Sequence, residues 1–67
     1  MKVLIIDDER AILETLEMFL GEKGYEVHTE EGGRKGLEAL RSDPPDVVIL
    51  DIRLPDIDGL EVLRRIR

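Results

Sequence analysis

The stretch Val3-Leu4-Ile5-Ile6-Asp7-Asp8 decides the fold, because four apolar residues lead directly into two carboxylates. The apolar run is short, rich in branched side chains and uninterrupted, which is typical of a strand covered on both faces of a parallel sheet. A second stretch of this kind, Val47-Val48-Ile49-Leu50-Asp51, also ends in a carboxylate. The two stretches predict two buried strands that carry acids at their carboxyl ends.

A helix and an edge strand are predicted after the first of these strands. Apolar residues recur there at the spacing of a helix, at Ile12, Leu13, Leu16, Phe19 and Leu20. Asp8 is placed to cap the start of this helix, and Gly24 can end it in a left-handed conformation. Residues 25–29 alternate in polarity, as a strand at the edge of a sheet does. We expect Phe19 to lie in the core and Tyr25 at its edge.

Two further helices are predicted on either side of the second apolar strand. The helix over residues 34–41 is the weaker one and has a flexible start, since a glycine inside a helix costs about 1 kcal/mol against alanine and three glycines lie within residues 32–36. Pro44-Pro45 ends it. Apolar residues at helical spacing begin the last helix after Gly59. The resulting order, β-α-β-α-β-α, predicts an α/β fold with a parallel sheet and right-handed crossovers.

The size and composition of the chain restrict its class. A chain of 67 residues forms one small domain. A core of that size supplies only about 3–5 kcal/mol, so such domains usually need a covalent staple or a partner. There is no cysteine to form a disulfide, which fits a reducing compartment.

The charge and the hydropathy of the chain exclude several kinds of partner. A net charge of −6 argues against direct binding to nucleic acid or to an anionic membrane surface. The first apolar run is too short for a signal peptide, and no stretch approaches the roughly 20 apolar residues of a membrane span. We therefore expect a soluble, cytoplasmic protein.

The acids at the strand ends are the candidate site. Ligands of open parallel sheets bind beyond the carboxyl ends of the strands, where the strand order reverses. If the two apolar strands are neighbours, Asp7, Asp8 and Asp51 converge there and repel one another unless a cation binds. Carboxylates without histidine or cysteine favour Mg²⁺ or Mn²⁺ over Zn²⁺. Such an ion would screen a phosphoryl group, so that one carboxylate could attack phosphorus. By spacing alone, the acidic pair could equally be a turn with a helix cap.

Two segments resemble the receiver domains of two-component response regulators. They are the opening strand with its acidic pair, Val3-Leu4-Ile5-Ile6-Asp7-Asp8-Glu9, and the segment Asp51-Ile52-Arg53-Leu54-Pro55-Asp56-Ile57-Asp58-Gly59. The resemblance implies a three-layer, flavodoxin-like fold in which the strands present here take the order 2-1-3.

The same resemblance implies the roles of the site residues. Asp51 is the phosphoacceptor, and it receives its phosphoryl group from a sensor histidine kinase with the help of Mg²⁺. Asp8 is a direct ligand of the metal, Asp7 holds it mainly through water, and Asp51 and the backbone carbonyl of Arg53 complete the metal site. The chain is then a signalling domain and not an enzyme.

The resemblance also implies that residues 1–67 are the first three βα units of a truncated receiver domain. The family has five strands, and its second half supplies a Ser or Thr, a Lys and the usual signalling surface. With three strands, Val47-Val48-Ile49-Leu50 forms an open apolar edge that could pair with a second chain. The alternative function is therefore a self-associating structural fragment whose acidic pocket is not competent for phosphorylation. A metal-dependent phosphatase is a weaker alternative, since the acid–base groups that it needs are not evident.

Three other motifs carry no functional prediction. The glycines of residues 32–36 lack the spacing of a phosphate-binding loop. Asp56-Ile57-Asp58-Gly59 has the wrong residues around it for a calcium loop. His28 lies on the polar side of the edge strand, where we expect it to be solvated.

Overall fold

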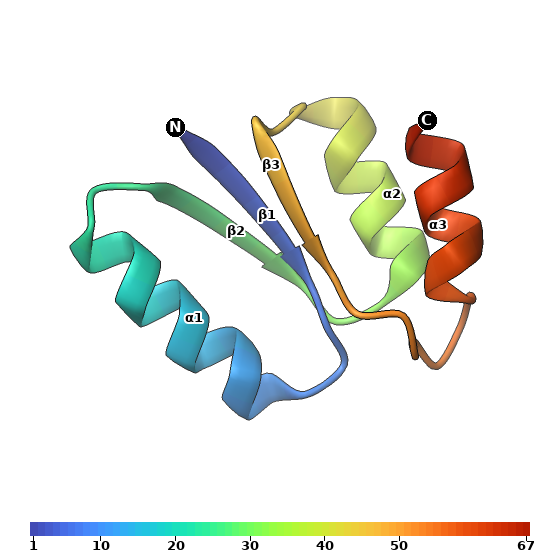
Figure 1. The fold of residues 1–67 in the computed structure, drawn as a ribbon, viewed down its shortest axis with the longest axis horizontal. Helices are drawn as coiled ribbons and strands as arrows, with labels where there is room; N and C mark the ends of the chain where they lie inside the picture. Colours follow the sequence, from blue (N-terminus) through green and yellow to red (C-terminus); the bar gives the residue numbers. More distant parts are fainter.

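All 67 residues are described by a computed structural model, which consists of a three-stranded sheet flanked by helices (Figure 1). The elements follow in the order β1 (Lys2–Ile6), α1 (Arg10–Glu22), β2 (Glu26–Glu30), α2 (Gly33–Ser42), β3 (Val47–Leu50) and α3 (Gly59–Ile66). The predicted alternation of strands and helices is confirmed.

The sheet is parallel and has the order β2-β1-β3. The central strand is β1, in which Val3 pairs with Val27 on one side and with Val47 on the other. The two apolar strands are therefore neighbours, and β2 is an edge strand, as predicted. Because the chain returns from β2 across β1 to β3, the order of the strands reverses beside β1.

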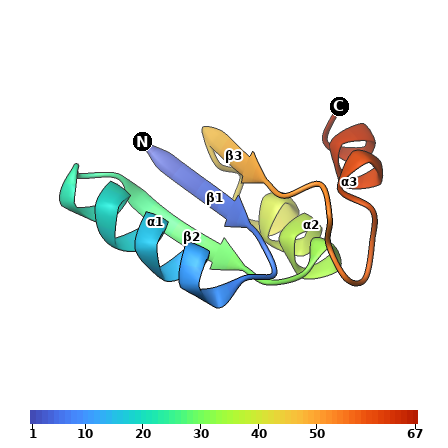
Figure 2. The ribbon, with the colours of Figure 1, turned by 60° about the horizontal axis from the view of Figure 1, so that its bottom comes forward.

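Both faces of β1 are buried, which explains why its apolar run is uninterrupted. Val3 and Ile5 pack with Leu13 of α1 in one cluster, while Leu4 and Ile6 contribute to a second cluster on the other face. Leu37 of α2 and Val62 of α3 complete that second cluster. The helices accordingly lie on opposite sides of the sheet, α1 on one and α2 with α3 on the other (Figure 1, Figure 2).

The glycines of α2 allow close packing. A Cβ atom at Gly36 would lie 2.5 Å from Cδ1 of Ile6, and one at Gly33 would lie 1.9 Å from Cγ2 of Ile57. Both glycines are buried. These positions hold glycine because α2 packs tightly against Ile6 of β1 and against Ile57 in the loop from β3 to α3. The flexible helix start that we expected does not account for them.

The prediction for the start of α1 is wrong. Glu9, and not Asp8, occupies the N-cap position, and no side chain caps this end of the helix. The carboxylate of Asp7 instead accepts a hydrogen bond from the backbone N–H of Glu9 (2.9 Å). At the other end, Gly24 adopts a φ of 92°, so the predicted left-handed end of the helix is confirmed.

Phe19 lies outside the core, contrary to expectation. Its side chain is 54% exposed, and the ammonium group of Lys23 lies 5.3 Å from the centroid of its ring. The cluster beneath α1 is built on β1 and β2. That cluster contains neither Phe19 nor any residue of β3.

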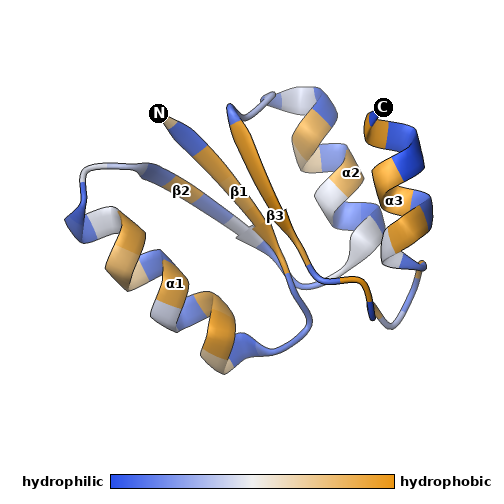
Figure 3. Cartoon of the chain, viewed as in Figure 1, coloured by the Kyte–Doolittle hydropathy of each residue, from blue (hydrophilic) through white to orange (hydrophobic).

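The outer edge of β3 is open, as predicted, but the prediction that β3 is buried on both faces is wrong, because its residues alternate between exposed and half-buried. This strand pairs only with β1, and the side chains of Val47 and Ile49 are 42% and 39% exposed. Figure 3 shows β3 as hydrophobic along its whole length. None of the helices is both long enough and apolar enough to cross a lipid bilayer.

Candidate functional site

The candidate site lies where β1 and β3 end side by side. The backbone N–H of Asp51 donates a hydrogen bond to the carbonyl oxygen of Ile6 (2.9 Å), and that of Asp7 donates to Glu30 (3.1 Å). These bonds continue the strand pairing beyond the last residues of the strands. The chain segments that carry the acids are therefore held by the sheet.

The three predicted carboxylates converge. Each of Asp7, Asp8 and Asp51 offers one carboxylate oxygen, and these oxygens all lie within 4.8 Å of one another. Asp7 and Asp51 are half-buried and Asp8 is exposed. None of the three forms an ion pair with a basic side chain. The site thus holds three neighbouring acids whose charges no protein cation neutralises, which is the condition that favours a bound divalent ion.

Local hydrogen bonds orient two of these carboxylates. Oδ1 of Asp51 accepts from the backbone N–H of Arg53 (3.1 Å), and Oδ1 of Asp7 accepts from that of Glu9 (2.9 Å). Each bond closes a short turn in which an aspartate side chain binds the N–H two residues ahead. Asp8 makes no such bond, so its oxygens are free to bind a ligand.

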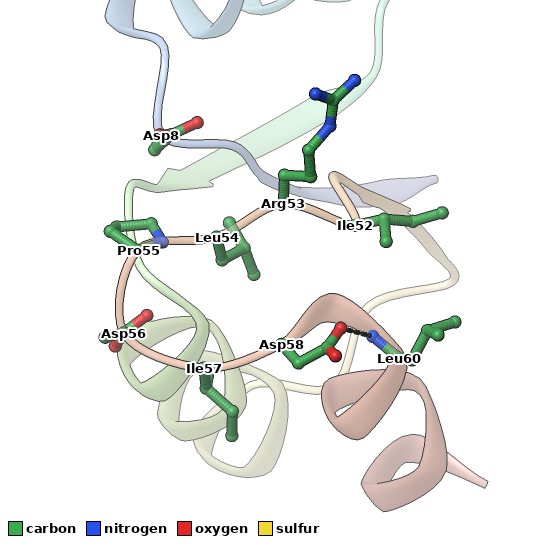
Figure 4. A pocket seen from close by; sticks show the side chains of 9 residues that line it. All are labelled: Asp8, Ile52, Arg53, Leu54, Pro55, Asp56, Ile57, Asp58 and Leu60. Carbon is green, nitrogen blue, oxygen red and sulfur yellow. Dashed lines mark hydrogen bonds between the residues drawn. The ribbon is translucent and has the colours of Figure 1, made fainter.

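An open hollow lies beside the acids, along the loop from β3 to α3. Asp8 lines one side of it, and Arg53 lies in the same hollow (Figure 4). The side chain of Arg53 extends away from the loop. The remaining lining residues belong to the loop and to the first turn of α3: Ile52, Leu54, Pro55, Asp56, Ile57, Asp58 and Leu60.

The base of this loop is closed by tight backbone contacts. The N–H of Gly59 donates to the carbonyl oxygen of Ile52 (2.9 Å). Asp58 then caps α3, since its Oδ1 accepts from the N–H of Leu60 (2.9 Å; Figure 4). We call residues 51–59 the acceptor loop. The start of α3 is thereby joined to the end of β3.

Asp56 holds a position that the sequence did not reveal. Its two carboxylate oxygens accept from the backbone N–H groups of Gly33 (2.9 Å) and Arg34 (3.1 Å) at the start of α2. These two bonds keep the pKa of Asp56 below its ordinary value of 3.8. No local signal could have identified this contact, because the partners lie 23 and 22 residues apart in the chain.

Comparison with known proteins identifies the family. A family model described as the response regulator receiver domain matches residues 3–67. The chain belongs to this family. It is 44% identical over 66 residues to the response regulator MprA of Mycolicibacterium vanbaalenii, a match that covers 98% of this chain and 29% of MprA.

Solved receiver structures share the fold. The response regulator TrrA of Thermotoga maritima, solved in complex with Mg²⁺ and BeF, is 47% identical and superposes with a TM-score of 0.93 over 98% of this chain and 57% of the TrrA chain. TrrA has also been solved in complex with the histidine kinase ThkA, and that structure superposes with a TM-score of 0.92 at the same identity and coverage. This receiver chain therefore has the predicted flavodoxin-like topology, and it spans just over half of the TrrA chain and less than a third of MprA.

The receiver assignment identifies the chain as a signalling domain. The predicted family, fold and strand order are confirmed. The convergence of the three acids agrees with the predicted metal site, whereas the roles of the individual residues stay predictions.

Proposed function

We propose that this receiver chain accepts a phosphoryl group on Asp51 from the phosphohistidine of a sensor histidine kinase, with Mg²⁺ bound beside it. The observation that carries the proposal is the position of Asp51. Its carboxylate stands at the end of β3, within 4.8 Å of oxygens from Asp7 and Asp8, and one of its own oxygens is held by the N–H of Arg53. The complex of the related TrrA with a histidine kinase supports the choice of donor.

The residues present fit a magnesium ion. Asp7, Asp8 and Asp51 supply only oxygen ligands, and no protein cation competes for them. We assign these three residues and the backbone carbonyl of Arg53 as the groups that hold Mg²⁺, or Mn²⁺ in its place. When bound, the ion supplies positive charge that screens the carboxylates from the oxygens of the phosphoryl group.

The chain itself supplies the nucleophile and its orientation. Oδ1 of Asp51 is engaged by the N–H of Arg53, which leaves Oδ2 without a protein partner. A carboxylate oxygen of Asp51 forms the new bond to phosphorus while the bond from phosphorus to the imidazole nitrogen of the donor breaks. The electron pair of the broken bond stays on the imidazole. The product is an aspartyl phosphate. The chain therefore acts as an acceptor in signalling and not as a classical enzyme. We propose that the exchange takes place in the cytoplasm.

The test is phosphorylation by a small donor. The chain is incubated with Mg²⁺ and acetyl phosphate, and its intact mass is measured, with Asp51→Asn as the control. A gain of one phosphoryl group by the parent chain and none by the variant is expected. The Ser or Thr and the Lys that the resemblance assigns to the second half of a receiver are not among these strands. A folded parent chain that gains no mass would therefore show that three strands are not sufficient for acceptance.

Self-association through β3 is a second proposed property. The open edge presents unpaired backbone groups next to the exposed side chains of Val47 and Ile49, and such an edge is a template for pairing with another strand. Light scattering should give a mass above that of one chain, and Ile49→Lys should lower it by placing a charge at the interface. A parent mass equal to that of one chain, with a sharp thermal transition, would refute self-association.

A further inference from the structure

We infer that Asp56 is a positioning residue for the phosphoacceptor site: by fastening the acceptor loop to the start of α2, it holds Arg53 and Asp51 in place. This inference rests on the proposed function. Asp56 is not one of the three converging acids, and it acts on the site through the contacts that restrain Asp51 and Arg53.

The first support is the pair of hydrogen bonds made by Asp56. The first N–H groups of any helix lack partners within the helix, and a residue at the N-cap usually satisfies one of them with its own side chain. The N-cap residue of α2 is Gly32, which has no side chain to do so. Asp56, which belongs to the acceptor loop, caps the helix instead: its carboxylate accepts from the N–H of Gly33 (2.9 Å) and from the N–H of Arg34 (3.1 Å). The negative charge of its carboxylate also suits the positive end of the helix dipole.

The second support is the apolar contact next to these bonds. A Cβ atom at Gly33 would lie 1.9 Å from Cγ2 of Ile57 and 3.2 Å from Cδ1 of Leu54. Both of those side chains belong to the acceptor loop and pack against the cluster that contains Val62. Two independent kinds of contact, one polar and one apolar, thus press the middle of the loop onto the start of α2.

The third support is the geometry of the loop as a whole. Its base is closed by the bond from the N–H of Gly59 to Ile52, and its first turn by the bond from the N–H of Arg53 to Asp51. Asp56 anchors the middle of the loop, between the two residues that close its base, Ile52 and Gly59. Arg53 lies between the base and this anchor. If this polar anchor is lost, only the apolar contacts of Leu54 and Ile57 hold the middle of the loop, and the turn that orients Asp51 loses support.

Asp56 could instead act only as a helix cap. In that case its loss would weaken α2 and lower the stability of the domain, but the turn at Arg53 would be unchanged. The amide proton of Arg53 separates the two roles, since it reports the hydrogen bond to Asp51 directly and needs no metal. The affinity for Mg²⁺ is the second readout, because Asp51 and Arg53 are proposed ligands.

The experiment compares the parent chain with Asp56→Ala and Asp56→Asn by NMR, well below their melting temperatures. Amide exchange at Arg53 is measured first without metal, and Mg²⁺ alone is then titrated. Gly24→Ala is the matched control. We expect it to destabilise the chain, because alanine rarely adopts the φ of 92° found at this residue, although no atom lies within 4 Å of the added Cβ. Gly24 lies between α1 and β2, away from the site.

For Asp56→Ala we expect faster exchange of the Arg53 amide and an affinity for Mg²⁺ lowered about tenfold, at the lower end of what outer-shell residues of metal sites contribute. Asp56→Asn has one acceptor oxygen in place of two, so it should fall between the alanine variant and the parent, and Gly24→Ala should match the parent. Unchanged exchange at Arg53 in Asp56→Ala, with altered amide signals at Gly33 and Arg34, would overturn the inference.

The two readouts also separate this inference from the proposed function. A parent chain that does not bind Mg²⁺ would refute the proposed metal site, while the exchange at Arg53 would still decide whether Asp56 holds the loop. If Asp56→Ala does not fold, amide exchange at Arg53 is compared between Asp56→Asn and Gly24→Ala instead. Faster exchange in Asp56→Asn would support the positioning role of Asp56, and equal exchange in the two variants would refute it.

Discussion

Replacing Gly59 by alanine tests how closely α3 is joined to the phosphoacceptor strand. Gly59 is buried at the first residue of α3. A Cβ atom there would lie 2.5 Å from the carbonyl oxygen of Asp51 and 2.5 Å from Cα of Ile52. Both contacts are with backbone atoms, so no change of a side-chain rotamer can relieve them. The start of α3 and the end of β3 must move apart, or the variant is strained.

The expected loss of stability follows from two opposing effects. Overpacking a buried site typically costs about 1–3 kcal/mol, and contacts with backbone atoms place this site at about 3 kcal/mol. Alanine returns at most about 1 kcal/mol through its higher helix propensity. The free energy of unfolding should therefore fall by about 2 kcal/mol, a large part of the roughly 3–5 kcal/mol that a domain of this size can have. With a urea dependence of about 1 kcal/mol per molar, the midpoint of unfolding should fall by about 2 M.

The assay is urea unfolding followed by circular dichroism, with Gly21→Ala as the matched control. Gly21 also lies in a helix, but no atom lies within 4 Å of a Cβ added there. Alanine should therefore stabilise the chain at this position, by about 0.5 kcal/mol. The same substitution is thus expected to have opposite signs at two helical glycines. A midpoint for Gly59→Ala equal to or above that of the parent chain would refute the close approach of α3 to Asp51.

Three further outcomes are expected. Val62→Ala removes two methyl groups from a side chain with no exposed surface and should lower the free energy of unfolding by about 2 kcal/mol. Leu60 is 51% exposed, so Leu60→Ala should change the free energy of unfolding by less than about 0.5 kcal/mol. Equal losses for the two variants in urea unfolding would contradict the assignment of Val62 to the inner face of α3. Asp8→Asn should weaken Mg²⁺ binding at least about tenfold by calorimetry, and an unchanged affinity would remove Asp8 from the proposed site. Because the pKa of Asp56 is below 3.8 in the folded chain, its bonds stabilise the fold above pH 3.8 and lose this effect as the pH falls through the lowered pKa. The difference in melting temperature between the parent and Asp56→Ala should therefore shrink in acid, and a constant difference across that range would contradict the charge-dependent cap.

Much of the fold could be predicted because its signals are local. Uninterrupted apolar runs over residues 3–6 and 47–50 predicted two strands buried on both faces, which is confirmed for β1 but wrong for β3, whose residues are half-buried or exposed. Helical spacing predicted the segments between the strands. Gly24 marked the left-handed end of α1. The convergence of the acids could be anticipated too, since the carboxyl ends of neighbouring parallel strands lie at one edge of a sheet.

The predictions for Asp8 and Phe19 were wrong because the local sequence does not define what either side chain contacts in the folded chain. Asp8 has the residue type of a helix cap, but α1 begins one residue later than that prediction required, and Asp8 lies with the acids. Phe19 has the spacing of a core residue, but its position in the core depends on what covers that side of α1. Spacing along one helix defines a face and does not define what lies opposite it.

The sequence by itself determined the class of fold, the family and the three acids, because each depends on residues close together in the chain or on a rule that holds for every parallel sheet. Only the tertiary structure decided the role of Asp56 and the requirement for glycine at positions 33, 36 and 59. Each of these depends on an approach of a few ångströms between separate elements of the fold. The physical reason is that hydrogen bonds and steric contacts act over such short distances that the packed arrangement of α2, β3 and α3 must exist before they can be assigned.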